Sequence, residues 1–465
     1  MKKIIYILLF VYAIIAALTI YFFDGTGDAG DSIQHYLYGK YAPVHPELFF
    51  DHWAKPLYVL LISPFVQFGF TGVKVFNAIV SFLTIFLTYK TVEALNIKNA
   101  IISVVILIFA PLYYILTFSG LTEPLFALFI SIGLYASVKQ KFITVALVIS
   151  FLPFVRSEGL IIIGVFGLYL LLKRKYKLLP ILLTGHIVYS IAGFFVYHDL
   201  FWVFTKIPYA RMSSQYGSGK LFDFAQDLIY VIGVPIYALF WLGVISISWK
   251  SIKKKINLEL GILVFLGFIS FFVAHSLFWY FGIFNSMGLK RVMIGVMPMI
   301  SIISLYGFNF ITEDVFGTRK NGKLIFQFLL AAYIIIFPFT SNPAAINWDK
   351  DMRLSKDQKS AIQTVDFIIK NKGTNHRFIF DHPYLSEVLN IDCFDKNKKI
   401  DLTNNALNQI KEGDIIIWEN WFAVVENGIT KKQLDNNPEL INFYNANSTG
   451  GGREINYSVY EKELK

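Results

Sequence analysis

Eleven apolar segments fill most of the first 340 residues, and they limit the chain to few folds. The first segment, 4–23, is about twenty residues long, which is enough for a helix to cross the hydrocarbon core of a bilayer. Charged residues make up 16% of the chain, whereas a soluble globular protein has about 25%. These features predict a mainly α, polytopic membrane helix bundle. The predicted transmembrane helices lie at 4–23, 72–92, 99–116, 122–138, 142–155, 159–172, 178–197, 226–248, 258–282, 292–311 and 324–340.

The charges of the loops predict the orientation of this bundle. If the N-terminus is cytoplasmic, the inner loops and segment ends hold 17 Lys and Arg residues, and the outer ones hold 9. Cytoplasmic loops of membrane proteins carry such an excess. The densest basic clusters, KRKYK at 173–177 and KSIKKK at 250–255, both lie inside. We therefore expect a multi-pass protein of the inner (cytoplasmic) membrane that contacts membrane lipids. The inner loops also account for the net charge of +10, so we expect no nucleic-acid partner.

The composition changes at about residue 341, where Asp, Asn, Lys and Gln become frequent. One stretch has the apolar spacing of a helix, and three have the pattern of strands. The helix pattern covers 355–373, and the strand patterns cover 376–383, 413–420 and 453–462. The sequence thus predicts a membrane module over 1–340 and a small extracytoplasmic α/β domain over 341–465. The single cysteine, Cys393, excludes an intramolecular disulfide.

The first predicted outer loop, 24–71, gathers acidic and histidine side chains. If 28–38 is helical, Asp31 and His35 are four residues apart on one face, with Asp28 one turn earlier. Two interpretations stay open here. Asp28 is a candidate helix cap, and Asp28, Asp31 and His35 are candidate ligands of a divalent metal ion. The sequence indicates no other cofactor.

Five short motifs follow one another along the predicted membrane module. They are Asp31 within GDSIQHY, DHWAKPLY at 51–58, GLTEPLFALF at 120–129, VRSEGLIII at 155–163 and GLKRVMIGVMP at 288–298. In this order, and all on the predicted outer side, they resemble motifs of the GT-C glycosyltransferases. Those membrane enzymes, mannosyltransferases and arabinosyltransferases among them, use a polyprenyl-phosphate-linked sugar as donor. The resemblance covers roughly residues 1 to 340.

The resemblance implies a GT-C-like fold and a transfer reaction at the outer face of the membrane, in cell-envelope glycan biosynthesis. A hexose or pentose would pass, with inversion, from the polyprenyl-phosphate donor to a hydroxyl of a lipid, glycan or protein acceptor. Asp31 is then the expected general base, which takes the proton of the acceptor hydroxyl. Asp51, together with His52, is the second candidate for that role.

The same motifs supply the residues that we expect to bind substrate. They are Asp51, His52, Lys55, Glu123, Arg156, Glu158, Lys290 and Arg291. Lys290 and Arg291 are basic residues on the predicted outer side, where basic residues are fewer, and they suit a donor phosphate. The alternative is that their side chains reach lipid headgroups. Glu123 is alternatively an acid favoured by the dipole of its helix. Arg156 and Glu158 alternatively form only a surface pair.

Other function classes fit the apolar segments as well. A transporter or flippase of lipid-linked or glycan substrates is one alternative, and a polymerase or ligase using a diphosphate-linked glycan is another. Transporters are typically built from internal repeats and carry ionisable residues within their spans. This sequence shows no repeat that we detect, and its informative charges gather at the predicted outer ends of helices. The glycosyltransferase interpretation is therefore favoured.

Overall fold

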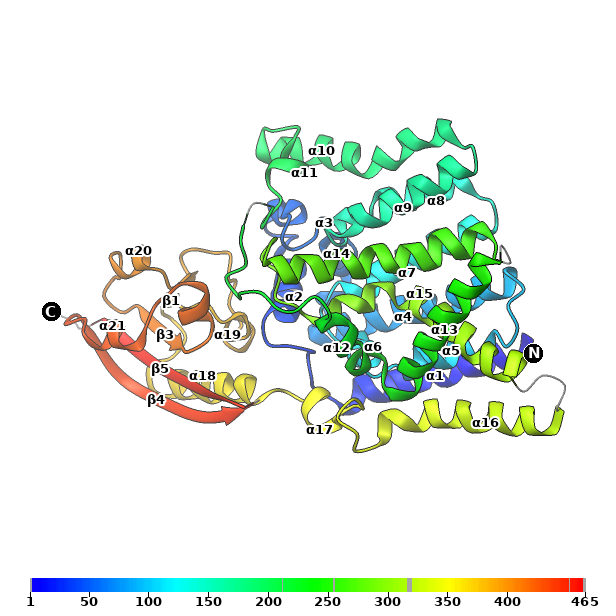
Figure 1. Cartoon of the computed structure of the whole chain (residues 1–465). Helices are drawn as coiled ribbons and strands as arrows, with labels where there is room; N and C mark the ends of the chain where they lie inside the picture. The colour runs from blue at the N-terminus through cyan, green and yellow to red at the C-terminus, as the bar shows by residue number, and fades with distance from the viewer. Residues whose placement is uncertain (1, 211, 254–255, 316–319, 451, 463–465) are drawn as a thin grey trace. The chain divides into compact units, whose positions relative to one another are not determined.

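The computed structural model of the protein describes residues 2–210, 212–253, 256–315, 320–450 and 452–462. The chain divides into two compact units (Figure 1). Unit 1 comprises Met1–Phe22 and Phe49–Asn347, and unit 2 comprises Phe23–Leu48 and Trp348–Lys465. The contacts thus group residues 23–48 of the predicted first outer loop with the C-terminal part of the chain.

Unit 1 is a bundle of helices. Its α-helices are α1 (Lys2–Phe22), α3 (Pro56–Val66), α4 (Phe70–Ala94), α5 (Ile101–Phe109), α6 (Pro111–Thr117), α7 (Glu123–Val138), α8 (Phe142–Ser150), α9 (Gly159–Leu172), α10 (Thr184–Tyr197), α11 (Trp202–Thr205), α12 (Asp223–Ile232), α13 (Val234–Ile252), α14 (Gly267–Phe281), α15 (Met297–Asn309) and α16 (Lys320–Ile336). Shorter 3-10 or π segments are η2 (Leu152–Phe154), η3 (Tyr176–Leu183), η4 (Glu259–Leu266), η5 (Lys290–Val296), η6 (Phe310–Val315) and η7 (Phe337–Phe339). A further 3-10 segment, η1 (Pro46–Phe50), begins in unit 2 and ends in unit 1.

All eleven predicted apolar segments are helical, although several are interrupted. Ala110, with an extended backbone, separates α5 from α6, which begins at Pro111, and Gly233, with a φ of +77°, separates α12 from α13. In the described part of the chain, seven helical stretches are long and apolar enough to cross a membrane, and four apolar helices are shorter. The predicted polytopic helix bundle is therefore confirmed. Arg211, Lys254, Lys255 and Arg319, which entered the count of loop charges, lie outside the described residues.

Glycines allow two helices of unit 1 to pack very closely. A Cβ atom added to Gly243 of α13 would lie 1.9 Å from the carbonyl oxygen of Ile303 in α15. One added to Gly307 of α15 would lie 1.9 Å from the carbonyl oxygen of Leu239. Membrane helices often meet at small residues in this way, because close backbone approach increases van der Waals contact.

Unit 2 combines helices with one sheet. Its elements are α2 (Asp31–Tyr41), α17 (Trp348–Asp351), α18 (Lys356–Lys372), β1 (Phe378–Ile379), α19 (Pro383–Val388), β2 (Lys399–Ile400), α20 (Asn404–Leu407), β3 (Ile415–Glu419), η8 (Phe422–Glu426), α21 (Lys431–Asp435), β4 (Leu440–Gly450) and β5 (Arg453–Lys462). The strand order is β2-β1-β3-β5-β4. Strands β2, β1 and β3 are parallel, while β5 runs antiparallel to β3 and β4.

The predicted elements of the C-terminal part are present. The helix expected over 355–373 is α18, which begins with a capping box of Ser355 and Gln358 and ends before Gly373 at a φ of +82°. The three strand patterns correspond to β1, β3 and β5. The predicted α/β fold of this part is therefore confirmed.

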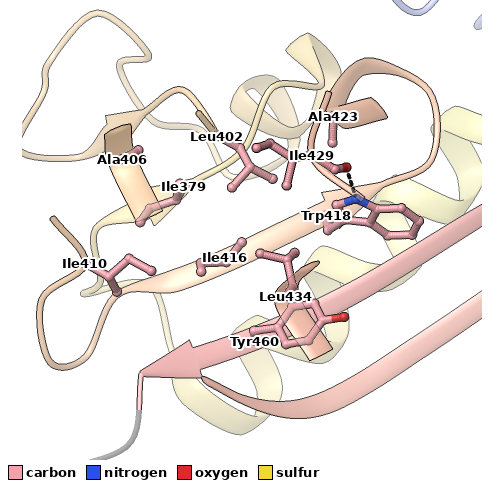
Figure 2. Packing of buried hydrophobic residues seen from close by; sticks show 10 residues of the cluster. All are labelled: Ile379, Leu402, Ala406, Ile410, Ile416, Trp418, Ala423, Ile429, Leu434 and Tyr460. Carbon is pink, nitrogen blue, oxygen red and sulfur yellow. Dashed lines mark hydrogen bonds between the residues drawn. The ribbon is translucent and has the colours of Figure 1, made fainter. Parts of the chain in front are cut away.

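One apolar cluster forms the core on one face of this sheet. It joins side chains from strands β1, β3 and β5 to others from the helices and loops that cover them (Figure 2). Trp418 of β3 is buried there, and its indole Nε1 donates a hydrogen bond of 2.8 Å to the carbonyl of Ile429. Burial of a Trp is favourable when its N–H finds such a partner.

Candidate functional site

Several predicted site residues of unit 1 converge at the start of α7. Glu123 is the first residue of this helix, and its side chain is 0% exposed. The loop before it is held by Asn77, whose Nδ2 donates to the carbonyls of Ser119 (2.6 Å) and Leu121 (3.2 Å). A buried carboxylate needs a cation or hydrogen-bond donors beside it, because the loss of water is costly for a charged group.

Arg156 provides that cation. Its Nη1 lies 2.8 Å from Glu123 Oε1, and its Nη2 lies 2.8 Å from Glu158 Oε1. Nη1 also donates to the hydroxyl of Thr122 at 3.1 Å. Arg156 lies in the turn between η2 and α9, and Glu158 directly precedes α9. The pair of Arg156 and Glu158 is therefore part of a larger, mostly buried arrangement that includes Glu123.

Two later segments add further nitrogens. The Nε atom of Arg291, in η5, lies 3.5 Å from Glu123 Oε1. The Nε2 atom of His275, in α14, lies 3.7 Å from Glu158 Oε1. His275 was not among the predicted site residues. Its sequence signal is its position near the predicted outer end of a span, which is equally typical of a packing histidine.

Lys55 reaches the same region from the start of α3. Its Nζ donates to Ser157 Oγ (3.2 Å) and to the carbonyl of His52 (3.2 Å). The backbone of Lys55 has a φ of +68°, although the residue is not a glycine and precedes Pro56. Such a conformation is uncommon for a residue other than glycine and costs energy.

We name these six residues the Glu123–Arg156 cluster: Lys55, Glu123, Arg156, Glu158, His275 and Arg291. Three of them are permanently basic side chains and two are carboxylates, so the cluster has an excess of one positive charge. Burial alone would raise the pKa of Glu158, but Arg156, His275 and Lys55 outweigh it and lower that pKa to about 2. Glu158 is therefore ionised at neutral pH and suits binding better than proton uptake.

Three other predicted residues of unit 1 have different contacts. Asp51 Oδ1 accepts a hydrogen bond from the backbone N–H three residues later (2.9 Å). His52 Nε2 donates to the carbonyl of Val203 (3.0 Å), and burial lowers the pKa of this imidazole. The ammonium of Lys290 lies 4.8 Å from the centre of the Tyr230 ring. Asp51 and His52 thus hold local structure, while Lys290 stacks on an aromatic side chain.

The predicted base and its neighbours lie in unit 2. Asp31 is the first residue of α2, and His35, one turn later, is buried. Asp28 Oδ1 accepts hydrogen bonds from the backbone N–H groups of Gly30 (3.0 Å) and Ser32 (2.9 Å). Asp28 therefore satisfies backbone donors at the start of α2, which agrees with the capping interpretation.

The predicted metal ligands do not form a ligand group. Among the residues that the structure describes, no three or more His, Cys, Asp or Glu side chains are arranged to hold a metal ion. One carboxylate oxygen of Asp28 accepts hydrogen bonds from two backbone N–H groups instead. We therefore assign no metal site to these residues.

C-terminal residues hold the loop that carries Asp31. Gln358 Nε2 donates to Thr26 Oγ1 (2.8 Å), which in turn donates to the carbonyl of Asp28 (2.7 Å). The hydroxyl of Ser32 donates to the carbonyl of Thr26 (2.5 Å). These bonds link the start of α2 to the first turn of α18, so the position of Asp31 depends on residues of the C-terminal part.

The other end of α2 is held in the same manner. Lys40 pairs with Glu387 of α19 at 2.8 Å, and His45 Nε2 lies 2.8 Å from Asp392 Oδ2. The Lys40 and Glu387 side chains are 347 residues apart in the sequence. Patterns of neighbouring residues in the sequence carry no information on contacts over such a separation. The pairs of Lys40 with Glu387 and of His45 with Asp392 were therefore not predicted.

The whole chain is similar to a solved membrane protein. It superposes on ArnT from Cupriavidus metallidurans bound to undecaprenyl phosphate with a TM-score of 0.63 and 11% sequence identity, over 98% of each chain. The apo state of the same protein gives a TM-score of 0.62. The chain has the GT-C fold.

The other comparisons add no closer relationship. An oligosaccharyltransferase from Archaeoglobus fulgidus reaches a TM-score of 0.47 at 12% identity, over 85% of this chain and 64% of that one. No protein-family model matches the sequence, and no curated protein matches it. The similarity to ArnT confirms the fold expected from the five motifs, whereas it shows neither the substrate nor the reaction of this chain.

Proposed function

We propose that this protein is a membrane glycosyltransferase that takes its sugar from a polyprenyl-phosphate-linked donor. The observation that carries the proposal is the Glu123–Arg156 cluster, which lies within a GT-C fold. Its excess positive charge, gathered at the starts of α3, α7, α9 and η5, suits an anionic phosphate. A likeness to ArnT, which has been seen with undecaprenyl phosphate, supports the choice of donor.

Within this proposal, Lys55 and Arg291 bind the donor phosphate, and Arg156 positions the two carboxylates around them. Arg291 is 20% exposed, whereas Glu123 is fully buried. The donor phosphate can therefore reach the guanidinium of Arg291, while the carboxylate of Glu123 stays buried in the protein. Glu158, which stays ionised, accepts hydrogen bonds from sugar hydroxyls.

The proposed reaction is a single displacement with inversion. The acceptor oxygen bonds to the anomeric carbon, and the bond between that carbon and the phosphate oxygen breaks. Polyprenyl phosphate leaves with the electron pair, and the proton of the acceptor hydroxyl passes to Asp31. Asp31 is the first residue of α2, and Asp28 satisfies backbone donors at the start of that helix. The acceptor is a lipid, glycan or protein hydroxyl at the outer face of the inner membrane.

The test uses the full chain, purified in detergent, with radiolabelled undecaprenyl-phosphate-linked hexoses and pentoses and a membrane lipid extract as acceptor. We expect transfer by the unmodified protein and a loss of 10²–10⁴-fold in turnover for Asp31→Asn, since a positioned base contributes about that much. Asp51→Asn is the matched control, because it changes the second candidate carboxylate. Binding of the donor by Asp31→Asn should be unchanged.

Three results would contradict the proposal in different ways. Equal turnover of Asp31→Asn and unmodified protein would remove Asp31 as the base. A loss confined to Asp51→Asn would transfer that role to Asp51. Absence of transfer and of donor hydrolysis for every donor, with the protein folded, would contradict the glycosyltransferase function itself.

A further inference from the structure

A second charged region lies at the opposite ends of the helices that carry the Glu123–Arg156 cluster. Helices α7 and α9 start at that cluster and end at Val138 and Leu172. At 1.5 Å per residue, their 16 and 14 residues span roughly 20–25 Å. The loops that follow them enclose a pocket of about 670 Å³. This pocket is therefore separate from the proposed donor site.

The two loops are shaped alike. Each helix is followed by a basic residue and then by a residue in the left-handed conformation, Gln140 (φ +58°) after α7 and Arg174 (φ +57°) after α9. A left-handed residue at a helix end turns the chain sharply. The chain then contributes Lys141–Thr144 from one side and Lys175–Leu178 from the other. The pocket is thus formed by two short, defined turns.

The lining of the pocket carries positive charge and no acidic residue. The ten lining residues are Gln140, Lys141, Phe142, Ile143, Thr144, Arg174, Lys175, Tyr176, Lys177 and Leu178. The nearby carboxylate of Glu259 pairs with Lys173 (2.7 Å) and accepts hydrogen bonds from Tyr169 (3.0 Å) and from the lining residue Gln140 (3.2 Å). In the part of the chain that the structure describes, no carboxylate pairs with the four cationic residues of the lining.

Apolar side chains surround these charges. Lys175 Nζ lies 5.0 Å from the centre of the Phe142 ring, and Tyr176 and Ile143 are 58% and 59% exposed. Exposed leucines continue along α9 and η3, among them Leu172 and Leu183. In a multi-pass membrane protein these side chains are suited to contact acyl chains. A soluble anion would gain nothing from them.

We propose that this pocket binds the phosphodiester headgroup of an anionic phospholipid, with its acyl chains along α9 and η3. Basic pockets between membrane helices, with apolar surfaces beside them, bind such headgroups. The proposal does not depend on the glycosyltransferase function. In the predicted orientation the lipid belongs to the cytoplasmic leaflet.

The test measures binding of dioctanoyl phosphatidylglycerol to the delipidated full chain by native mass spectrometry, with dioctanoyl phosphatidylcholine for comparison. We expect the anionic lipid to bind at least tenfold more tightly. The double variant Arg174→Gln/Lys177→Gln should lose about tenfold of that affinity. Both side chains are exposed, so the variant should fold, which its unfolding temperature checks.

The matched control is Lys250→Gln/Lys253→Gln. Lys250 and Lys253 lie at the end of α13, and the next element, η4, starts with Glu259, the partner of Lys173; neither lysine is part of the pocket. This control removes the same charge and should keep full lipid affinity. Equal weakening in both variants would overturn the proposal in favour of general surface attraction. Displacement of the lipid by an equal concentration of inorganic phosphate would overturn the lipid as ligand.

Discussion

Arg156 is the residue on which the other charges of the cluster depend. It pairs with Glu123 and Glu158 at 2.8 Å each, and Glu123 has no exposed surface. When one member of a buried ion pair is removed, the remaining charge is left without compensation, which costs about 3–5 kcal/mol. The stability of unit 1 should therefore be sensitive to this one guanidinium.

We expect Arg156→Gln to lower the unfolding temperature of the detergent-purified protein clearly. Glu123→Gln/Arg156→Gln should recover part of that loss, because the double variant no longer buries an uncompensated carboxylate. Differential scanning fluorimetry of Glu123→Gln, Arg156→Gln and the double variant measures the energetic coupling between the two side chains. Purely additive losses would contradict an energetic link between Glu123 and Arg156.

Asp381 of unit 2 gives a prediction about pH. Burial raises the pKa of its carboxyl from 3.8 to about 6, and its Oδ1 accepts a hydrogen bond from the Leu402 N–H (2.9 Å). The folded state thus binds this proton more tightly than the unfolded state does. The carboxyl therefore disfavours the folded state as the pH rises from about 4 to about 6, by roughly 1–3 kcal/mol once ionised.

The variant Asp381→Asn should remove this dependence, since its amide oxygen still accepts the Leu402 bond but carries no charge. We expect it to be more stable than the unmodified protein at pH 8, and the difference to shrink towards pH 4. Thermal unfolding of the full chain at several pH values measures it. A difference that is the same at every pH would show that the effect is not electrostatic.

At the scale of residues, the sequence located much of the cluster but not its pairing. Glu123, Arg156, Glu158 and Arg291 were recognisable because they lie in motifs that resemble those of the GT-C glycosyltransferases. Their mutual distances depend on how α7, α9 and η5 pack, which no single segment encodes. His275 was missed because one histidine in an apolar helix carries the same pattern whether it packs or binds.

At the scale of elements, the contact of α13 with α15 should be very sensitive to substitution. Both Gly243 and Gly307 face backbone carbonyls at distances that exclude any side chain. We expect Gly307→Leu to separate the two helices and to reduce the yield of folded protein strongly. Gly164 of α9 is the control, since a Cβ atom there would meet no atom within 4 Å. Size-exclusion profiles of Gly307→Leu and Gly164→Leu provide the comparison, and similar profiles would contradict the predicted difference.

The elements themselves were largely predictable. Long apolar runs predicted the helices, and the short apolar stretch 413–420 predicted β3, because both patterns depend only on residues that are close in the sequence. Strand β4 was not predicted, since NFYNANSTG (442–450) is polar and reads as a loop. Its strand character comes from pairing with β5 over its full length, which is a tertiary effect.

At the scale of the whole molecule, the predicted orientation can be tested by labelling. Cys393 is a poor target for thiol reagents, because burial raises its pKa to about 12 and the thiolate is the reactive form. In a Cys393→Ser background, we expect Glu412→Cys to react with a membrane-impermeant maleimide in intact cells. Ser251→Cys should react only after permeabilisation. The opposite labelling pattern would reverse the predicted orientation. Labelling of both cysteine variants in intact cells would contradict the prediction that residues 251 and 412 lie on opposite sides of the membrane.

The grouping of residues 23–48 with 348–465 has a consequence for biosynthesis. The segment 23–48, which contains Asp31, is followed by 299 residues (49–347) before Trp348, the first residue of its later partner segment, is translated. At about 5–20 residues per second, that interval lasts roughly 15–60 s. During this interval Tyr36 and Lys40 cannot yet bond to Glu387, and Thr26 cannot yet bond to Gln358, because these partners have not been synthesised. The proposed base is therefore held in place only after nearly the whole chain has been made, and an incomplete chain carries that carboxylate without its supports.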